Sequence, residues 1–180
     1  MSVSPDRTDV QALPRCFVAL MAPPAAQLQA DAGRAAWLWP AGVRPLLGAD
    51  LHLTLHFIGD VAAARLPALQ AALGRVRQPP VPVTLDTPML WRSGIAVLAG
   101  DATPALRALH QALAAALADA GFALETRPWR PHLTLARRAG GAGLPAGPQP
   151  LAWCAEAFTL ACRAEGTARR YRELARWPLG

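Results

Sequence analysis

The sequence contains no lysine. All eighteen basic residues are arginine, against twelve aspartates and glutamates, and the formal net charge is +6. A positive, arginine-rich surface suits RNA or another ligand that carries phosphate. Strong GC bias in a coding sequence also favours arginine over lysine and enriches alanine, glycine and proline, as seen here. The charge therefore permits a nucleic-acid partner but does not identify one.

Cysteine and long apolar runs are also scarce. The three cysteines, Cys16, Cys154 and Cys162, form no CxxC pair and are odd in number, which predicts buried free thiols in a reducing compartment. No apolar run reaches the roughly 18 residues that a membrane span needs, and residues 1–13 contain no apolar signal segment. We therefore expect a cytoplasmic protein that does not associate with membranes.

The 180 residues are sufficient for one domain with a buried core. We expect residues 1–13 to form a flexible tail and residues 14–180 to form a single domain. Hydrophobic periodicity and turn residues predict strands at 15–21, 51–59, 81–88, 89–100, 132–137, 152–164 and 168–177, and helices at 25–39, 61–77 and 104–120. This order of elements indicates an α+β fold.

One short motif occurs twice, as LHLTL at residues 51–55 and as HLTL at residues 132–135. Each copy places a histidine two residues before a threonine, His52 with Thr54 and His132 with Thr134. Side chains alternate between the faces of a strand, so each histidine shares a face with its threonine. The repeat suggests a pseudo-repeated fold in which both motifs contribute to one site.

Three kinds of chemistry could use such a histidine pair. A metal site would require three or four ligands; Asp50 and Asp60 flank the first motif, but the second has no acidic or cysteine neighbour. A nucleophilic triad would require an activated serine or cysteine, and no GxSxG motif is present. Acid–base catalysis on a phosphodiester fits best, with one imidazole as base, the other as acid, and threonine hydroxyls on the phosphate oxygens.

These motifs resemble those of the 2H phosphoesterase superfamily, and most closely the bacterial RNA 2′,3′-cyclic phosphodiesterases, also called 2′-5′ RNA ligases. The resemblance extends over RCFVAL, LHLTLHFIGD, WRSGIAVLAG, RPWRPHLTLAR and the segment from FTLACRA to ARWPL. It implies a bilobal fold with two pseudo-symmetric lobes, antiparallel sheets around a central cleft and helices outside. It also implies opening of RNA 2′,3′-cyclic phosphate ends to 2′-phosphate ends without metal or cofactor, and 2′-5′ ligation as the reverse type of reaction.

The resemblance also assigns roles to individual residues. His52 corresponds to the proton donor to the departing 3′ oxygen, and His132 to the base that activates water. Thr54 and Thr134 correspond to the phosphate-binding threonines. Many relatives have a histidine two residues before the second catalytic histidine, where this chain has Arg130.

Several other residues are candidates from their positions in the sequence. Arg130 and Tyr171 are candidate substrate contacts, and the alternation of the first motif strand predicts that His56 shares the face of His52. Trp91 and Trp129 stand next to the predicted cleft strands, and His110 is expected to pack on its helix. Arg137 and Arg138 follow the second motif and could contact an RNA backbone.

Two other functions fit the same motifs. The chain could act on a different cyclic or 2′-5′-linked nucleotide, or it could bind RNA ends without turnover. Two titratable groups in matching motifs argue for catalysis, because a pure binding module does not need them. We expect the protein to act as a monomer, with RNA or a nucleotide as its ligand and without an obligate protein partner.

Overall fold

The computed structural model describes residues 14–147, 150–164 and 170–180. The predicted tail, residues 1–13, lies outside them. The strands are β1 (Arg15–Met21), β2 (His52–Asp60), β3 (Val81–Leu85), β4 (Thr87–Trp91), β5 (Ile95–Ala99), β6 (His132–Ala136), β7 (Leu151–Ala155), β8 (Ala157–Arg163) and β9 (Tyr171–Pro178). The α-helices are α1 (Pro24–Arg34), α2 (Leu66–Leu73) and α3 (Pro104–Asp119), and short 3₁₀ helices span Gly48–Asp50 and Ala63–Arg65.

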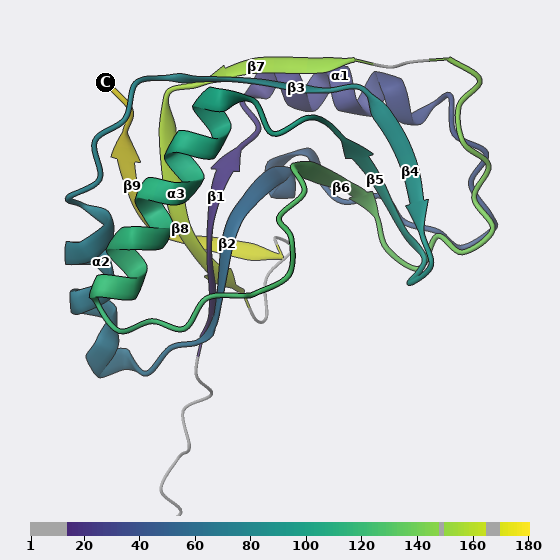
Figure 1. The fold of residues 1–180 in the computed structure, drawn as a ribbon. Coiled ribbons are helices and arrows are strands. Elements are labelled where there is room, and N and C mark those ends of the chain that lie inside the picture. The colour runs from purple at the N-terminus through teal and green to yellow at the C-terminus, as the bar shows by residue number, and fades with distance from the viewer. Residues whose placement is uncertain (1–13, 148–149, 165–169) are drawn as a thin grey trace, which may run out of the picture.

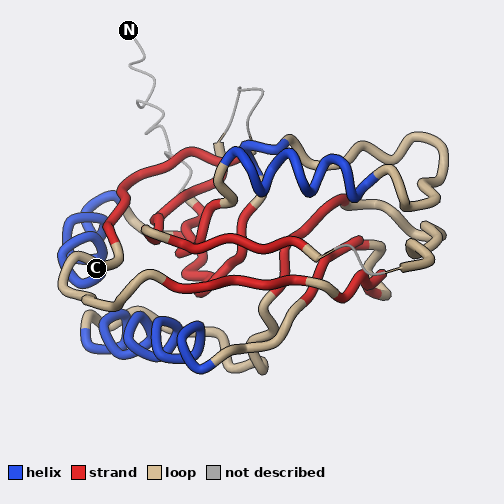
Figure 2. Tube along the Cα trace, turned by 90° about the horizontal axis from the view of Figure 1, so that it is seen from above, coloured by secondary structure: helices blue, strands red, loops and turns tan. Residues whose placement is uncertain are grey.

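Seven strands form one antiparallel sheet in the order β4-β5-β6-β2-β1-β8-β9, and β3 pairs with β7 in a separate ribbon. In Figure 1, β6, β5 and β4 arch away from the steeper strands β2, β1, β8 and β9. Viewed from above, α1 and α3 lie on opposite sides of the strands (Figure 2). The α+β class predicted from the sequence is confirmed. No helix in the described part of the chain is long and apolar enough to cross a membrane.

Helix α3 begins and ends where the sequence predicts. The Thr103 side chain accepts a hydrogen bond from the Leu106 backbone N–H at 3.2 Å, which caps a helix whose first residue is Pro104. Four leucines at helical spacing, Leu106, Leu109, Leu113 and Leu117, are fully buried. This apolar face packs against β2 and β3 and holds the first motif strand in place.

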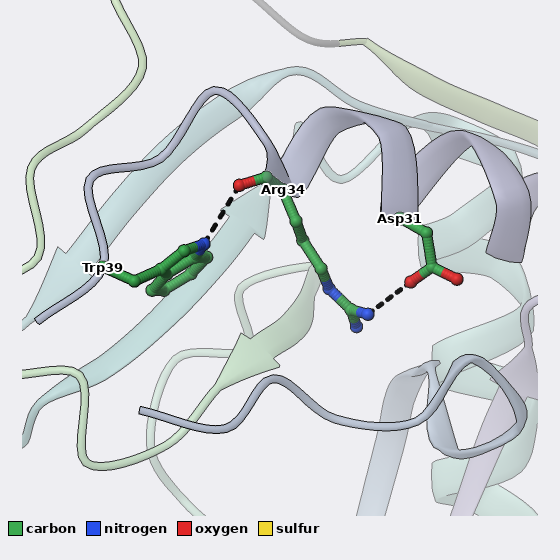
Figure 3. Close-up of polar contacts among 3 residues, drawn as sticks. All are labelled: Asp31, Arg34 and Trp39. Carbon is green, nitrogen blue, oxygen red and sulfur yellow. Dashed lines mark hydrogen bonds and ion pairs between the residues drawn. The ribbon is translucent and has the colours of Figure 1, made fainter. Parts of the chain in front are cut away.

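Helix α1 is shorter than predicted: it ends at Arg34 rather than Trp39. A longer helix would require the Leu38 N–H to bond the Arg34 carbonyl. Instead, Leu38 pairs with Gly143, and the Trp39 indole N–H donates to the Arg34 carbonyl at 3.0 Å (Figure 3). Arg34 itself is buried and forms an ion pair with Asp31. Sequence periodicity does not reveal this long-range pairing of Leu38 with Gly143.

The segment 152–164, predicted as one strand, forms two. Strand β7 pairs with β3 in the ribbon, whereas β8 pairs with β1 and β9 in the main sheet. The three cysteines are free, as predicted, and Cys16 lies opposite Cys162 in the buried sheet interior. The prediction that all three are buried is wrong for Cys154, which is exposed on the ribbon.

The two motif strands occupy equivalent places in the chain. In each half a strand precedes a helix and then pairs antiparallel with the motif strand that follows it: β1, α1 and β2 in one half, β5, α3 and β6 in the other. Strands β2 and β6 are neighbours at the junction of these halves. The repeated sequence is therefore accompanied by a repeated topology that brings both motifs together.

Candidate active site

The two motifs meet at one residue pair. Leu53 of β2 lies opposite Leu133 of β6 in antiparallel orientation, and both leucines are fully buried. Residues that flank an antiparallel pair face one another across the strands. His52 therefore faces Thr134, and Thr54 faces His132, so that the four motif side chains surround one point of the sheet.

Each motif strand contains a β-bulge directly after its threonine. On β2, Thr54 and His56 pair with the adjacent residues Ala19 and Val18, which leaves Leu55 as the extra residue. On β6, Thr134 and Ala136 likewise pair with Val97 and Ala96, which leaves Leu135 extra. The burial pattern is the same along both motifs, with a half-buried histidine and threonine between buried neighbours.

The bulge overturns the prediction for His56. Alternation placed His56 on the face of His52, but the extra residue turns it to the other face, which α3 covers. There His56 is buried and donates from Nε2 to the His110 carbonyl at 2.8 Å. The bulge also brings Phe57, which is 41% exposed, to the face of the site. The same shift on β6 moves Arg137 to the position that matches Phe57.

Both catalytic candidates are held in one tautomer by the chain just before them. His52 Nδ1 lies 2.7 Å from the Asp50 carbonyl oxygen, and His132 Nδ1 lies 2.7 Å from the Arg130 carbonyl oxygen. A carbonyl can only accept, so each Nδ1 carries the proton. In both rings Nε2 remains available to take up or donate a proton, as acid–base catalysis requires.

His52 lies among aromatic rings. Its ring stacks on Phe17 with centroids 4.8 Å apart and meets the edge of Tyr171 at 5.0 Å. Burial lowers the pKa of His52 from 6.5 to about 4; the Asp50 hydrogen bond partly opposes this, and His132 and Arg137 lower it further. Tyr171, a candidate from the sequence, is thus beside the predicted proton donor.

His132 lies on the other side of the motif pair. Its ring centroid is 4.6 Å from that of Trp91. Burial lowers the pKa of His132 below 6.5, opposed by the hydrogen bond to Arg130, and the charge of Arg137 lowers it further. Arg137 follows the second motif strand and lines the same cavity as His52 and Thr54, where its guanidinium can meet an anion.

Two cavities adjoin the histidines. The first, called here the arginine cavity, has a volume of about 310 Å³ and is lined by His52, Thr54, Phe57, Tyr171 and four arginines, Arg15, Arg137, Arg163 and Arg170, together with Phe17. A larger groove of about 900 Å³ shares Arg137, Arg163 and Arg170 with it and adds Arg44 and Arg138. The positive surface therefore continues away from His52, which suits a chain of phosphates.

The second, called here the aromatic cavity, has a volume of about 300 Å³ and lies beside His132. Thr54 and Phe57 line both cavities. Trp91, Trp129, His56 and His110 form its aromatic walls, and Glu125, Arg127 and Arg130 its polar part. Arg130, a candidate from the sequence, is therefore on the side of His132. Thr134 is half-buried and is not among the residues that line either cavity.

Asp50 has a structural role that no sequence pattern indicated. In the sequence it was considered only as a carboxylate that could bind a metal beside the first motif. Its carboxylate is buried and accepts the Arg170 backbone N–H at 3.1 and 3.2 Å. Its carbonyl meanwhile fixes the ring of His52. Asp50 thus ties the start of β9 to the first motif. Within the described ranges, no three histidine, cysteine, aspartate or glutamate residues gather as a metal site would require.

Comparison with known proteins identifies the family of this chain. A family model described as the 2′-5′ RNA ligase superfamily matches residues 23–165. An RNA 2′,3′-cyclic phosphodiesterase from Escherichia coli (strain K12) is 34% identical over 169 residues, which cover 92% of this chain and 96% of the relative. The chain belongs to the 2′-5′ RNA ligase superfamily, as the resemblance of its motifs implied.

Solved structures show the same fold. The crystal structure of E. coli LigT in apo form matches with a TM-score of 0.78 at 34% identity and covers 94% of this chain and 99% of LigT. LigT has also been solved in complex with 3′-AMP and with ATP. The protein TT0787 of Thermus thermophilus, at 21% identity and a TM-score of 0.70, covers 92% of this chain and 97% of its own, and shares the fold.

Proposed function

We propose that the protein hydrolyses RNA 2′,3′-cyclic phosphate ends to 2′-phosphate ends with His52 and His132 as its acid and base. The observation that carries this proposal is the matched pair of tautomers, because each Nδ1–H is bound to a carbonyl and each Nε2 is available. Membership of the superfamily and the identity with the E. coli phosphodiesterase support the substrate class.

The reaction needs one proton removed and one supplied. His132 Nε2 accepts a proton from water as the water oxygen attacks phosphorus, and the bond between phosphorus and the 3′ oxygen breaks. His52, protonated on Nε2, donates its proton to that 3′ oxygen, which leaves a 2′-phosphate and a 3′-hydroxyl. After the reaction His132 carries a proton on Nε2 and His52 does not, and proton exchange with solvent restores the starting state of both rings.

The phosphate is held by hydroxyl and guanidinium groups. We assign Thr54 and Thr134 to the non-bridging oxygens, with Arg137 neutralising charge that grows during attack. The unliganded His52, with its pKa of about 4, is mostly neutral at pH 7. A bound phosphate anion favours its protonated form, so that substrate binding itself prepares the acid.

The two halves of the sheet correspond in this proposal to the two lobes of the expected bilobal domain, with the substrate cleft along the junction of β2 and β6. Nucleotide complexes of LigT support a nucleotide ligand for this cleft. The arginine groove beyond it would hold the phosphates of the RNA that precede the cyclic end.

Purified protein with EDTA should convert a short RNA ending in a 2′,3′-cyclic phosphate to the 2′-phosphate product. His52→Asn and His132→Asn retain an N–H that can bond the same carbonyls but cannot exchange a proton, and each should reduce kcat by at least about 100-fold. Thermal melting checks that the variants fold. Loss of turnover in EDTA, or wild-type rates in either variant, would overturn the proposal.

A further inference from the structure

Asp50 is a buried acidic residue that stands two positions before the proposed proton donor, His52. It is the last residue of the 3₁₀ helix Gly48–Asp50, and it is only 3% exposed. Burying a carboxylate costs free energy, because water no longer solvates the charge. The contacts of Asp50 show what this buried group holds in place.

The backbone and the side chain of Asp50 hold two different parts of the site. The backbone carbonyl oxygen accepts the proton of His52 Nδ1, with 2.7 Å between the two atoms. The carboxylate oxygens accept the backbone N–H of Arg170 at 3.1 and 3.2 Å. The Arg170 carbonyl in turn accepts the Ala164 N–H at 2.9 Å, so the backbone of Arg170 is fixed on both sides.

Arg170 and the residue after it both belong to the site. The Arg170 side chain lines the arginine cavity and the larger groove beside it. Tyr171 follows as the first residue of β9, and its ring meets the His52 ring at 5.0 Å. Asp50 therefore connects the proton donor to the anion-binding start of β9, although 120 residues separate Asp50 from Arg170 in the chain.

The turn that carries Asp50 is tightly packed. The Asp50 N–H donates to the Leu47 carbonyl at 2.9 Å, and the Leu51 N–H donates to the Gly48 carbonyl at 3.0 Å. A Cβ atom at Gly48 would lie only 3.1 Å from the side-chain oxygen of Gln27. The position of Asp50 is thus set by its neighbours, which makes it a fixed point for the two groups that it binds.

We propose that Asp50 is a positioning residue, which holds His52 and Arg170 in one arrangement and acts on the substrate through them. This inference rests on the proposed function. The orientation of the acid and the binding of phosphate beside Arg170 are then properties of one assembled unit. Loss of the Asp50 side chain should impair both.

The charge of Asp50 also acts on His52. Burial lowers the pKa of His52 to about 4, and the charges of His132 and Arg137 lower it further, whereas the hydrogen bond and the charge of Asp50 raise it. The other titratable or charged groups that face His52 are Tyr171 and the arginines Arg15, Arg163 and Arg170. Among these groups, all within the part of the chain that the structure describes, Asp50 is the only carboxylate. Its charge therefore favours the acid form that the mechanism needs.

Asp50→Asn separates the charge from the hydrogen bond. The amide keeps an oxygen that can accept the Arg170 N–H, so the affinity for inorganic phosphate, measured by titration calorimetry, should not weaken. The free enzyme should carry a proton on His52 less often. As a result kcat/KM at pH 7 should fall by at least about threefold, and its maximum should move to lower pH.

Asp50→Ala removes the hydrogen bond as well. The Arg170 N–H loses a bond to a charged acceptor, so inorganic phosphate should bind at least about threefold more weakly than to Asp50→Asn, and KM for the RNA should rise. Asp119→Asn is the matched control, because it removes one negative charge at an exposed position of α3 that lines neither the arginine cavity nor the groove. Its pH profile and phosphate affinity should match the wild type.

A role of Asp50 in fold stability alone would lower the melting temperatures but leave the pH profile and the phosphate affinity of the folded variants unchanged. That result would overturn the inference. NMR titration of the His52 ring needs no turnover, and its midpoint should be lower in Asp50→Asn than in the wild type; an unmoved midpoint would refute the inference. If Asp50→Ala does not fold, the midpoint and pH profile of Asp50→Asn decide.

The proposed function and this inference can fail separately. If the wild-type protein hydrolyses no cyclic phosphate, the proposed function is wrong, and the His52 midpoint and the phosphate affinity still decide the role of Asp50. If the wild type is active and both Asp50 variants keep its pH profile and phosphate affinity, only the role of Asp50 is wrong.

Discussion

The pH dependence of catalysis tests the site in detail. Burial lowers the pKa of His52 from 6.5 to about 4 and that of His132 below 6.5. At pH 7 about one free enzyme molecule in a thousand then carries a proton on His52. The cyclic phosphate keeps its single negative charge near neutral pH, so any titration in this range belongs to the protein.

We therefore expect kcat/KM, which reports the free enzyme, to increase about tenfold per pH unit as pH falls from about 8 toward 6.5. It should pass through a maximum below pH 6.5, where His132 begins to take up a proton. The maximum of kcat, which reports the complex, should lie at higher pH, because the bound phosphate favours protonated His52. A kcat/KM that is flat or rises with pH from 6.5 to 8 would refute this reasoning.

NMR titration of the imidazole signals provides an independent measurement. The chain has four histidines, so four signals are expected, and His52→Asn identifies one by its loss. The His52 signal should remain that of the neutral ring down to about pH 5, and added inorganic phosphate should raise its midpoint. A midpoint at or above 6.5 without phosphate would show that burial does not control this residue.

Four further predictions concern charge, the phosphate site and stability. Arg137→Gln should move the kcat/KM maximum to higher pH, because Arg137 lowers the pKa of both histidines; an unmoved maximum would contradict this. Thr54→Val should lower kcat by about 10-fold or more through one lost hydrogen bond to phosphate, with its melting temperature as control. Leu53→Ala should cost about 3 kcal/mol by urea unfolding, because Leu53 is fully buried, whereas Leu28→Ala, at 72% exposure, should change stability by less than about 0.5 kcal/mol. The free energy of unfolding should fall as pH decreases from 6.5 to about 4, because the folded pKa of all four histidines is lowered and the unfolded chain therefore binds more protons in this range. His52 should account for on the order of 3 kcal/mol of this loss. In His52→Asn the urea midpoint should therefore shift less with pH than in the wild type.

Much of the site could be read from the sequence because the motif is local. The spacing of His52 and Thr54, and its repetition at His132, is enough to predict shared faces and acid–base chemistry. The strands that carry the motifs and the start of α3 at Thr103 follow from periodicity and from residues near in the chain.

The missed features depend on contacts between distant segments. Nothing in LHLTLHF marks Leu55 as a bulge, because the bulge is defined by the pairing partner, Val18 and Ala19 of β1. The sequence therefore could not predict its consequences, which are that His56 lies on the face covered by α3 and that Phe57 is exposed on the face of the site. The early end of α1 likewise depends on Gly143, more than a hundred residues along the chain from Leu38.

The matched bulges have a consequence for the direction of the reaction. Around the Leu53–Leu133 pair the two imidazoles are nearly equivalent in their backbone setting. Each has the same tautomer, each is held by the carbonyl two residues before it, and each faces the threonine of the other motif. Such a pair cannot by itself distinguish which oxygen of a cyclic phosphate departs. Two residues after the extra residue of each bulge, however, the halves differ, because Phe57 follows the first motif and Arg137 follows the second. On the proposed mechanism, regioselectivity is a property of the unlike surroundings of the two histidines, which include these two side chains and the different cavities on the two sides.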